Sequence, residues 1–381
     1  MTLRVALVAG QLTYGGAEKQ LVYMARALHR AGVCVRVYTF GAEVFYEAVL
    51  RDVGLRPIVI GATANPLVRL VTLARALRRF RPHVAQAGQF YVNLYVALAS
   101  RLCGSLAIGA IRSDGVRDLQ NVGRWGPLSL RAPSALVTNS LRARDAVVRL
   151  GVNRDKIHVV PNVVDTEMFD RASGSRPAAP EAGRAVVMLV AQLIRAKRVD
   201  RFLEALALAR RSTPGLTGLV VGDGPERPVL EASAGRLGLL PNGVAFCGVS
   251  DAVPRLMAEA QILALTSDQE GLPNVILEAM AARLPVVSTP AGDAANLIDQ
   301  GITGFVVPLD ATKEFAERLV QLAWSPPLRQ QLGDAGYERV KARYACDGLA
   351  DRLLGVYRAA ARHSGYVSVM AKLPPSVTAP S

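Results

Sequence analysis

Short apolar runs alternate with amphipathic stretches along most of the chain. Residues 3–8 form an apolar run typical of a buried strand, and a second such run covers residues 33–40. Between them, residues 17–31 carry apolar side chains at helical spacing, namely Leu21, Met24, Ala25 and Leu28. The order strand, helix, strand predicts a parallel unit with a right-handed crossover.

The same alternation continues through the first half of the chain. Further apolar runs lie at 57–60, 83–86, 107–110 and 135–138, and helical patterns such as residues 67–80 separate them. This pattern predicts a doubly wound α/β domain.

A stretch without apolar periodicity interrupts the pattern near the middle of the chain. Residues 171–183 are rich in Gly, Ser, Pro and Ala, which is typical of a linker. We therefore predict a first domain at 1–170, a linker at 171–184 and a second domain at 185–345.

The second half repeats the class of the first without repeating its sequence. Strands are predicted at 185–190, 216–221, 244–247, 262–265, 285–289 and within 301–308, and helices at 200–211, 227–237, 311–323 and 327–344. A last helix is expected at 346–362, followed by a flexible tail at 363–381. The predicted fold class is α/β, with two Rossmann-like domains facing each other across a deep cleft.

Composition and charge restrict the class of protein. Of 381 residues, 51% are hydrophobic and 20% are charged, which indicates a folded chain. The net charge of +14 favours phosphate-rich partners, whether nucleic acid, anionic membrane or nucleotides. The four cysteines form no CxxC pair, so we expect reduced thiols and a cytoplasmic location.

Neither a membrane span nor a nucleic-acid site is indicated by the sequence. The most apolar long segment, residues 94–111, is interrupted by Arg101 and Gly104, and the first ten residues resemble a strand rather than a signal peptide. Arginines gather on and after the predicted helix at 67–80, at Arg69, Arg75, Arg78, Arg79 and Arg81. Without interleaved aromatic residues they do not indicate nucleic-acid binding. They form either a solvated helix face or a surface for anionic lipids, which allows peripheral attachment to the inner face of the cytoplasmic membrane.

Two carboxylates, Glu270 and Glu278, mark the strongest candidate site. The apolar run at 262–265 ends in polar residues, and Pro273 suits the first turn of a helix that runs to about Arg283. Backbone N–H groups at 272–275 would favour an anion, and Gly271 would let it approach closely. Glu278 would accept hydrogen bonds from ribose hydroxyls. The alternative is ordinary helix-start chemistry without a ligand.

A glycine pair opens the first long helix. Gly15 and Gly16 follow the first predicted strand, at the edge where doubly wound sheets bind ligands. The spacing lacks the GxGxxG fingerprint of dinucleotide sites, so a tight turn explains the pair equally well.

Taken together and in order, these motifs resemble the retaining GT-B glycosyltransferases of the family 4 group, also known as glycosyl transferases group 1. The likeness covers about residues 4–345. The matching pieces are Gly15-Gly16-Ala17-Glu18, Val160-Pro161-Asn162 with Asp165 and Phe169, Leu193 with Lys197, Gly222-Asp223-Gly224-Pro225, the EX7E pair Glu270 and Glu278, Pro285-Val286-Val287-Ser288-Thr289, and Gly301 to Pro308.

The resemblance implies a role for each of these residues. Glu270 would contact the donor sugar, Glu278 would bind the ribose, and Lys197 would hold the diphosphate. The other donor-binding residues implied are Gly271, Leu272, Pro273, Asn274, Val275 and Gly222. Gly15 and Gly16 would lie near the diphosphate and the acceptor, and the last helix would pack back on the first domain.

The chain departs from the family pattern at two places. Gln192 stands where the family has an Arg, and Arg195 or Arg198 could replace that cation. Many relatives carry a histidine in the first domain's cleft, where this chain has Arg112 in the segment Ile111-Arg112-Ser113-Asp114. Arg112 is therefore the acceptor-side candidate.

Other chemistry finds little support in the sequence. No two aspartates stand two apart, so there is no DxD motif for a divalent cation, and we expect neither a metal nor a cofactor. The resemblance implies transfer of a sugar from a UDP- or GDP-sugar donor to a sugar or lipid-linked sugar acceptor, in bacterial cell-surface polysaccharide or glycolipid synthesis. A nucleotide-sugar epimerase of the same fold and a non-catalytic nucleotide-sugar-binding relative remain as alternatives.

Overall fold

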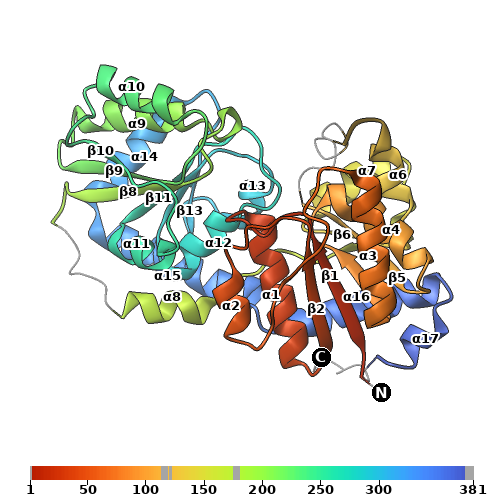
Figure 1. Cartoon of the computed structure of the whole chain (residues 1–381). Helices are drawn as coiled ribbons and strands as arrows, with labels where there is room; N and C mark the ends of the chain where they lie inside the picture. The colour runs from red at the N-terminus through yellow and green to blue at the C-terminus, as the bar shows by residue number, and fades with distance from the viewer. Residues whose placement is uncertain (1, 113–118, 120–121, 175–180, 374–381) are drawn as a thin grey trace. The chain divides into compact units, whose positions relative to one another are not determined.

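The computed structural model describes residues 2–112, 119, 122–174 and 181–373 (Figure 1). Its chain divides into two compact units, one made of Met1–Val163 with Cys346–Ser381 and the other of Val164–Ala345. We call them unit 1 and unit 2.

Unit 2 begins earlier than the second domain predicted from the sequence. Val164 donates its backbone N–H to the Tyr344 carbonyl at 2.8 Å, and Phe169 is fully buried in a core of unit 2. The segment before the predicted linker is therefore not part of unit 1, although we predicted that the first domain extends to residue 170. Residues 175–180 of the linker lie outside the described part of the chain.

Unit 1 contains a seven-stranded sheet in the order β3-β2-β1-β4-β5-β6-β7, and all its pairings are parallel. Its strands are β1 (Arg4–Ala9), β2 (Cys34–Thr39), β3 (Ile58–Val59), β4 (Val84–Ala87), β5 (Leu106–Ile111), β6 (Ala135–Thr138) and β7 (Ile157–Val159). The apolar run at 57–60 contains β3, an edge strand whose Ile58 and Val59 are exposed.

Helices cover both faces of this sheet. They are α1 (Gly16–Arg30), α2 (Glu47–Arg51), α3 (Pro66–Phe80), α4 (Asn93–Arg101), α6 (Gly126–Arg131), α7 (Leu141–Arg149), α16 (Leu349–His363) and α17 (Val367–Met370), with 3-10 turns η1 (Phe90–Val92), η2 (Gly123–Trp125) and η3 (Arg154–Lys156). Side chains of β1 alternate between two cores: Val5 and Leu7 pack with α1 and α16, whereas Ala6 and Val8 pack with α3 and α4.

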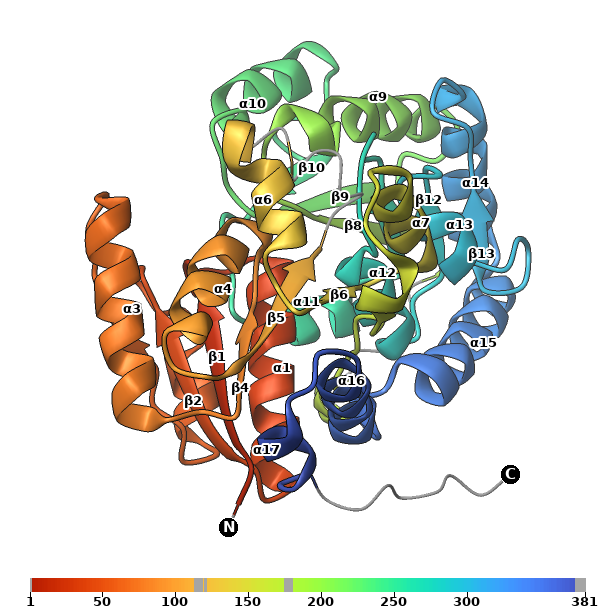
Figure 2. The ribbon, with the colours of Figure 1, turned by 90° about the vertical axis from the view of Figure 1, so that its right-hand side faces the viewer.

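The end of the chain completes unit 1. Leu353 and Tyr357 of α16 are fully buried against the sheet, and α17 follows it at the lower end of the unit (Figure 2). The predicted flexible tail is therefore wrong for its first part, because Val369 is buried and Leu373 packs on the same core. Residues 374–381 lie outside the described part.

Unit 2 contains a six-stranded parallel sheet in the order β10-β9-β8-β11-β12-β13. Its strands are β8 (Ala185–Val190), β9 (Leu216–Val221), β10 (Val244–Phe246), β11 (Ile262–Leu265), β12 (Val286–Ser288) and β13 (Gly304–Val306). Its helices are α8 (Thr166–Ser173), α9 (Val199–Arg210), α10 (Arg227–Arg236), α11 (Val253–Glu259), α12 (Asn274–Ala281), α13 (Ala294–Leu297), α14 (Thr312–Trp324) and α15 (Pro326–Tyr344), with the 3-10 turn η4 (Arg195–Lys197).

The sheet of unit 2 is also buried on both sides. In β8, Val187 and Leu189 pack with α9 and α14, whereas Met188 packs in the core that contains α12. Near-continuous apolar strands are what a parallel sheet covered on both faces requires. Two such sheets confirm the predicted α/β class.

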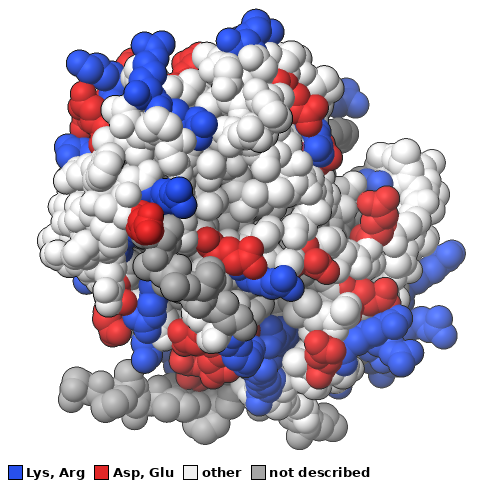
Figure 3. All heavy atoms as spheres, turned by 90° about the vertical axis from the view of Figure 1, so that its left-hand side faces the viewer, with Lys and Arg blue, Asp and Glu red and all other residues white. Residues whose placement is uncertain are grey.

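The apolar segment at 94–111 is divided between α4 and β5. Throughout the residues that the structure describes, no helix combines the length and apolar character needed to cross a bilayer. On the face drawn in Figure 3, basic and acidic side chains are intermingled, so the net charge of +14 does not make that face uniformly basic.

Candidate active site

The loop between β11 and α12 carries the first carboxylate of the EX7E pair. Glu270 Oε1 accepts a hydrogen bond from Lys197 Nζ at 2.6 Å and another from Ser267 Oγ at 2.7 Å. The Lys197 and Glu270 side chains retain 23% and 13% of their exposure. A carboxylate held by an ammonium and a hydroxyl is thus accessible at the surface of unit 2.

Turn η4 is fixed against this loop, which explains why Lys197 reaches Glu270. The Asp268 N–H donates to the Ala196 carbonyl at 3.0 Å, and Thr266 Oγ1 donates to the Lys197 carbonyl at 3.3 Å. Arg201 of α9 donates to the Thr266 carbonyl at 2.6 Å and to Asp268 Oδ1 at 2.9 Å. These bonds join the segments after β8 and after β11 into one rigid element.

The structure separates the two arginines that could replace the missing family Arg. Arg198 contacts the carboxylates of Asp200 and Asp268, and hydrogen bonding to Asp200 raises its pKa. The pKa of the Asp268 carboxyl is lowered. Burial alone would raise this pKa, but hydrogen bonds from Arg201 and Arg198 outweigh that effect. Arg195 is exposed, as is Gln192, and within the described ranges no ion pair engages Arg195.

The helix that follows begins one residue later than predicted, with Pro273 as the N-cap of α12 at φ −70° and ψ 110°. Leu272 is buried, and Glu278 in the second turn is only 6% exposed. Glu278 lies on the same short helix as the segment 274–275 that the sequence associated with a diphosphate. The structure therefore gathers Glu270, Gly271 and α12 into one local region.

Two glycines allow the backbone to approach closely beside this region. Gly222, at φ +132°, would place a Cβ 1.9 Å from the Ala191 carbonyl oxygen, so only glycine fits. Gly292, at φ +58°, would place one 2.2 Å from the Gly271 carbonyl oxygen. The Asp293 N–H donates to that same oxygen at 2.9 Å. The loop after β12 thus supports the loop that bears Glu270.

All of these residues follow the carboxyl ends of neighbouring strands. Lys197 follows β8, Gly222 follows β9, Glu270 follows β11 and Gly292 follows β12. Since the strands are parallel, these ends meet at one edge of the sheet, where open α/β sheets bind ligands.

The glycine pair of unit 1 lies at the start of α1. Gly15 is the N-cap in an extended conformation, and Gly16 is the first helical residue. A Cβ at Gly15 would lie 2.1 Å from Glu18 Oε2, so the glycine makes room for this carboxylate. Glu18 Oε1 accepts a hydrogen bond from Gln89 Nε2 at 3.0 Å, and burial raises the pKa of Glu18.

Arg112 follows β5 at the same edge of the unit 1 sheet. It is partly exposed, but its Nε atom is buried and has no hydrogen-bond partner among the described residues. One guanidinium nitrogen lies 3.6 Å from Met24 Sδ, and burial lowers the pKa of Arg112 to about 10. Asn139, after β6, donates to the Arg112 carbonyl at 3.2 Å. Among the described residues, the Arg112 guanidinium forms no ion pair with a carboxylate. Residues 113–118 lie outside the described part.

Several residues of these two regions were not identified from the sequence. Arg201 was missed because its partners are distant in sequence, and Gly292 because its role depends on another loop. Ser267 lies only three residues before Glu270 and was missed because the sequence does not show where its hydroxyl points. Gln89 could have been found as a polar residue just after an apolar strand. In the part of the chain that the structure covers, no group of three or more His, Cys, Asp or Glu side chains could hold a metal ion.

Comparison with known proteins supports the same assignment. The family model "Glycosyltransferase Family 4" matches residues 14–168, and "Glycosyl transferases group 1" matches residues 184–324. The chain is 27% identical over 323 residues to the alpha-D-kanosaminyltransferase of Streptomyces kanamyceticus, with 79% of this chain and 83% of the relative covered. It is 27% identical over 349 residues to the lipopolysaccharide core biosynthesis glycosyltransferase LpsE of Rhizobium meliloti, with coverages of 89% and 95%.

Solved structures share the fold. Anabaena Alr3699/HepE in complex with UDP and glucose superposes with a TM-score of 0.80 at 22% identity, covering 93% of this chain and 98% of that one. The apo form of the lipopolysaccharide outer core galactosyltransferase WaaB gives a TM-score of 0.69 at 18% identity, with coverages of 93% and 99%. The two family models, the relatives and these folds establish that the chain belongs to the retaining glycosyltransferases of family 4, with the GT-B fold.

Proposed function

We propose that unit 2 binds a nucleotide-diphosphate sugar at the carboxyl edge of its sheet and that unit 1 binds the sugar acceptor. The observation that carries this proposal is the pairing of Lys197 and Glu270 at 2.6 Å, with Ser267 on the same carboxylate oxygen. The two residues are 73 positions apart in sequence, and both follow strands at the carboxyl edge of the sheet, where open α/β sheets bind ligands.

In this proposal each residue takes a separate part of the donor. Lys197, the start of α12 and the backbone of Gly271 bind the diphosphate, with Leu272, Pro273, Asn274 and Val275 as the first residues of that cradle. Glu270 contacts the transferred sugar and Glu278 binds the ribose. Gly222 lets its loop pack closely against the Ala191 carbonyl. Arg195 supplies the positive charge that the family's Arg would supply at the position of Gln192.

The chemistry follows from where charge develops. As the bond between the sugar carbon and the diphosphate oxygen breaks, negative charge grows on the leaving diphosphate and positive charge on the sugar ring. The Lys197 ammonium and the helix N-terminus stabilise the first, and the Glu270 carboxylate stabilises the second. Acting in a partly buried site, these groups are worth more than they would be in water.

Single substitutions test this assignment. We expect Lys197→Met and Glu270→Gln to lower kcat by about 100-fold or more in a donor-consumption assay. Glu259→Gln, which removes an exposed carboxylate of the same unit, should leave the rate unchanged. Parent-like rates for both site variants would refute the proposed donor site.

The donor is proposed to be a UDP-sugar, with a GDP-sugar as the second choice. The support is the fold shared with HepE, whose structure holds UDP and glucose. Calorimetric titration of the protein with UDP, GDP, ADP and dTDP should give the tightest binding with UDP, and Glu278→Ala should weaken it by about tenfold. Equal affinity for all four nucleotides would contradict recognition of the base.

The acceptor is proposed to be a sugar or a lipid-linked sugar in the synthesis of a cell-surface polysaccharide or glycolipid. The relative LpsE acts in lipopolysaccharide core biosynthesis. Gly15, Gly16 and Arg112 line the carboxyl edge of the unit 1 sheet, where the acceptor would enter. A radiolabelled donor incubated with the protein and a lipid extract should label a lipid-soluble product.

Anionic membrane is the proposed partner surface for unit 1. The outer face of α3 exposes Leu67, Val68 and Val71 near its start, with Leu67 72% exposed, and basic residues Arg75, Arg78 and Arg79 near its end. Exposed apolar and basic side chains on one helix are typical of interfacial binding. A membrane-facing α3 would deliver unit 1 to a lipid-linked acceptor.

Cosedimentation with vesicles tests this surface. The variant with Arg75, Arg78 and Arg79 all replaced by Gln should lose binding to phosphatidylglycerol vesicles. A matched triple variant with Gln at Arg211, Arg236 and Arg343, exposed positions of unit 2, should retain it. Equal binding by the two variants would exclude α3 as the contact.

A further inference from the structure

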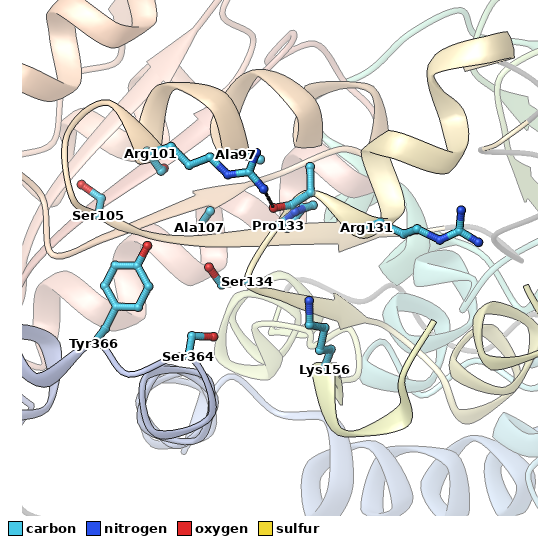
Figure 4. A pocket seen from close by; sticks show the side chains of 12 residues that line it. Ala97, Arg101, Ser105, Ala107, Arg131, Pro133, Ser134, Lys156, Ser364 and Tyr366 are labelled. Carbon is cyan, nitrogen blue, oxygen red and sulfur yellow. Dashed lines mark hydrogen bonds between the residues drawn. The ribbon is translucent and has the colours of Figure 1, made fainter. Parts of the chain in front are cut away.

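Unit 1 has a second polar region, at the opposite edge of its sheet from Arg112. A cavity of about 270 Å³ lies where β5 and β6 begin, between α4, the segment before β6, turn η3 and the residues after α16 (Figure 4). In a parallel sheet the amino ends of the strands lie together, so this cavity is separate from the carboxyl edge. It is not part of the glycosyl transfer site proposed above.

Among the described residues, the cavity is lined by three cations and by no carboxylate. Arg101, Arg131 and Lys156 come from α4, α6 and η3. Arg101 donates to the Ala132 carbonyl at 3.4 Å, which directs its guanidinium toward the segment before β6 (Figure 4). Among the residues that the structure describes, none of the three forms an ion pair. Figure 4 shows the Arg131 guanidinium directed away from Ser134 and Tyr366. The positive charge that Arg101 and Lys156 bring to the cavity wall favours an anion.

Hydroxyl groups add neutral donors to the same wall. Ser134 and Tyr366 approach the cavity from different elements (Figure 4). Ser100 also lines it and is fully buried, yet its Oγ has no hydrogen-bond partner within the described ranges. Ser105 differs, because its Oγ donates to the Pro82 carbonyl at 2.7 Å. A buried hydroxyl without a partner is costly, and a ligand oxygen that reached Ser100 Oγ would satisfy it.

We propose that this cavity binds a phosphate-type anion. Guanidinium, ammonium and hydroxyl donors around one space match the oxygens of a phosphoryl group. The volume leaves room for a small organic part beside the phosphoryl group. The phosphate would belong either to a soluble phosphorylated metabolite or to a membrane phospholipid. With either source, the cationic side chains would favour the phosphate over a neutral ligand.

Thermal unfolding with inorganic phosphate at constant ionic strength provides the first test. The parent protein should show a saturable rise in Tm of a few degrees. The double variant Arg131→Gln/Lys156→Gln should lose this rise, whereas the double variant Arg30→Gln/Arg56→Gln, which removes exposed charge elsewhere in unit 1, should keep it. No rise in the parent, or an equal rise in both variants, would overturn the proposal.

Ser100→Ala separates binding from folding. Removing an unpartnered buried hydroxyl should leave the Tm without phosphate unchanged or slightly higher. The Kd for phosphate should rise by roughly tenfold, because a hydrogen bond to a charged ligand is lost. An unchanged Kd would refute the part assigned to this buried donor and with it the proposed geometry.

Vesicles identify the source of the phosphate. If the two double variants sediment equally with phosphatidylglycerol vesicles while differing in their response to free phosphate, the ligand is a soluble phosphate compound. If Arg131→Gln/Lys156→Gln sediments less, a lipid phosphate enters the cavity. Helix α3 is intact in both variants, and Lys197 and Glu270 lie in unit 2, so failure here leaves the donor and α3 proposals untouched.

Discussion

At the scale of single residues, the position of Glu270 depends on two donors that reach the same oxygen. Lys197 supplies a charged hydrogen-bond donor, whereas Ser267 supplies a neutral one, whose main expected effect is to orient the carboxylate. Orientation matters because a charge stabilises a transition state only when it is already in place.

Ser267→Ala isolates this orienting effect. We expect kcat to fall by about tenfold with little change in the KM for the donor, since the hydroxyl is proposed to touch Glu270 and not the donor. Ser288→Ala is the matched control, because Ser288 is equally buried and its Oγ donates to the Thr289 carbonyl. Steady-state kinetics of both variants make the comparison, and similar losses in both would argue against a specific role of Ser267.

Glu18 gives a prediction about pH and stability. Its raised pKa means that the folded protein binds this proton more tightly than the unfolded chain does, so its contribution to the free energy of unfolding falls as pH rises from about 4.5 through the raised value. Glu18→Gln does not titrate. Its stability relative to the parent should therefore increase with pH across that window and then level off.

Urea unfolding at a series of pH values measures this difference. Glu43→Gln, at an exposed position of unit 1, is the control and should differ from the parent by a nearly constant amount. If the free energy of unfolding of Glu18→Gln also differed from that of the parent by a constant amount at every pH, the pKa of Glu18 would not be raised in the folded protein.

At the scale of elements, the donor loop is supported by its neighbour. The loop after β12 contacts the loop after β11 through backbone atoms of Gly271, Gly292 and Asp293. Backbone contacts hold a loop more rigidly than exposed side chains do, and rigidity favours a pre-formed phosphate site.

Gly292→Ala tests this support. The positive φ alone should cost about 1 kcal/mol, and the overlap with Gly271 should add roughly 1–3 kcal/mol and weaken nucleotide binding. Gly301→Ala shares a positive φ of +73°, but a Cβ there meets nothing within 4 Å. The Gly301→Ala variant should therefore lose only about 1 kcal/mol of stability and keep its affinity for the nucleotide. Unfolding and nucleotide titration measure the two quantities.

At the scale of the whole molecule, the two units differ in how the chain builds them. Unit 2 is one continuous segment with its own cores, whereas unit 1 needs the segment from Cys346 onward to cover one face of its sheet. Tyr357 is fully buried there and donates to Gln86 of β4. Unit 1 therefore cannot be completed until the end of the chain is present.

Fragments test this difference. A fragment of residues 164–345 should unfold cooperatively and bind UDP, because it contains both of its cores. A fragment of residues 1–163 should lack a cooperative transition, and a peptide of residues 346–373 should restore one. Circular dichroism and calorimetry measure these outcomes, and a stably folded 1–163 fragment would show that α16 is dispensable.

Local patterns were sufficient for much of this protein. The period of apolar residues predicted most strands and the longer helices, because burial on both faces of a parallel sheet leaves continuous apolar runs. The EX7E pair and the glycine pair were visible because each lies within a few residues of a strand end or a helix start. The tail that contains the buried Val369 was wrongly predicted to be flexible, because the sequence alone does not show which segments pack against it.

Other features depend on contacts between distant parts of the chain. Lys197 and Glu270 are 73 residues apart, and Gly292 matters only because Gly271 lies against it. The start of unit 2 at Val164 follows from pairing with Tyr344, which no local pattern reports. The sequence by itself thus determined the class of fold and the candidate carboxylates, through local periodicity and spacing. Only the tertiary structure decided which residues orient them and which chain segments complete each unit, because those are properties of packing between segments.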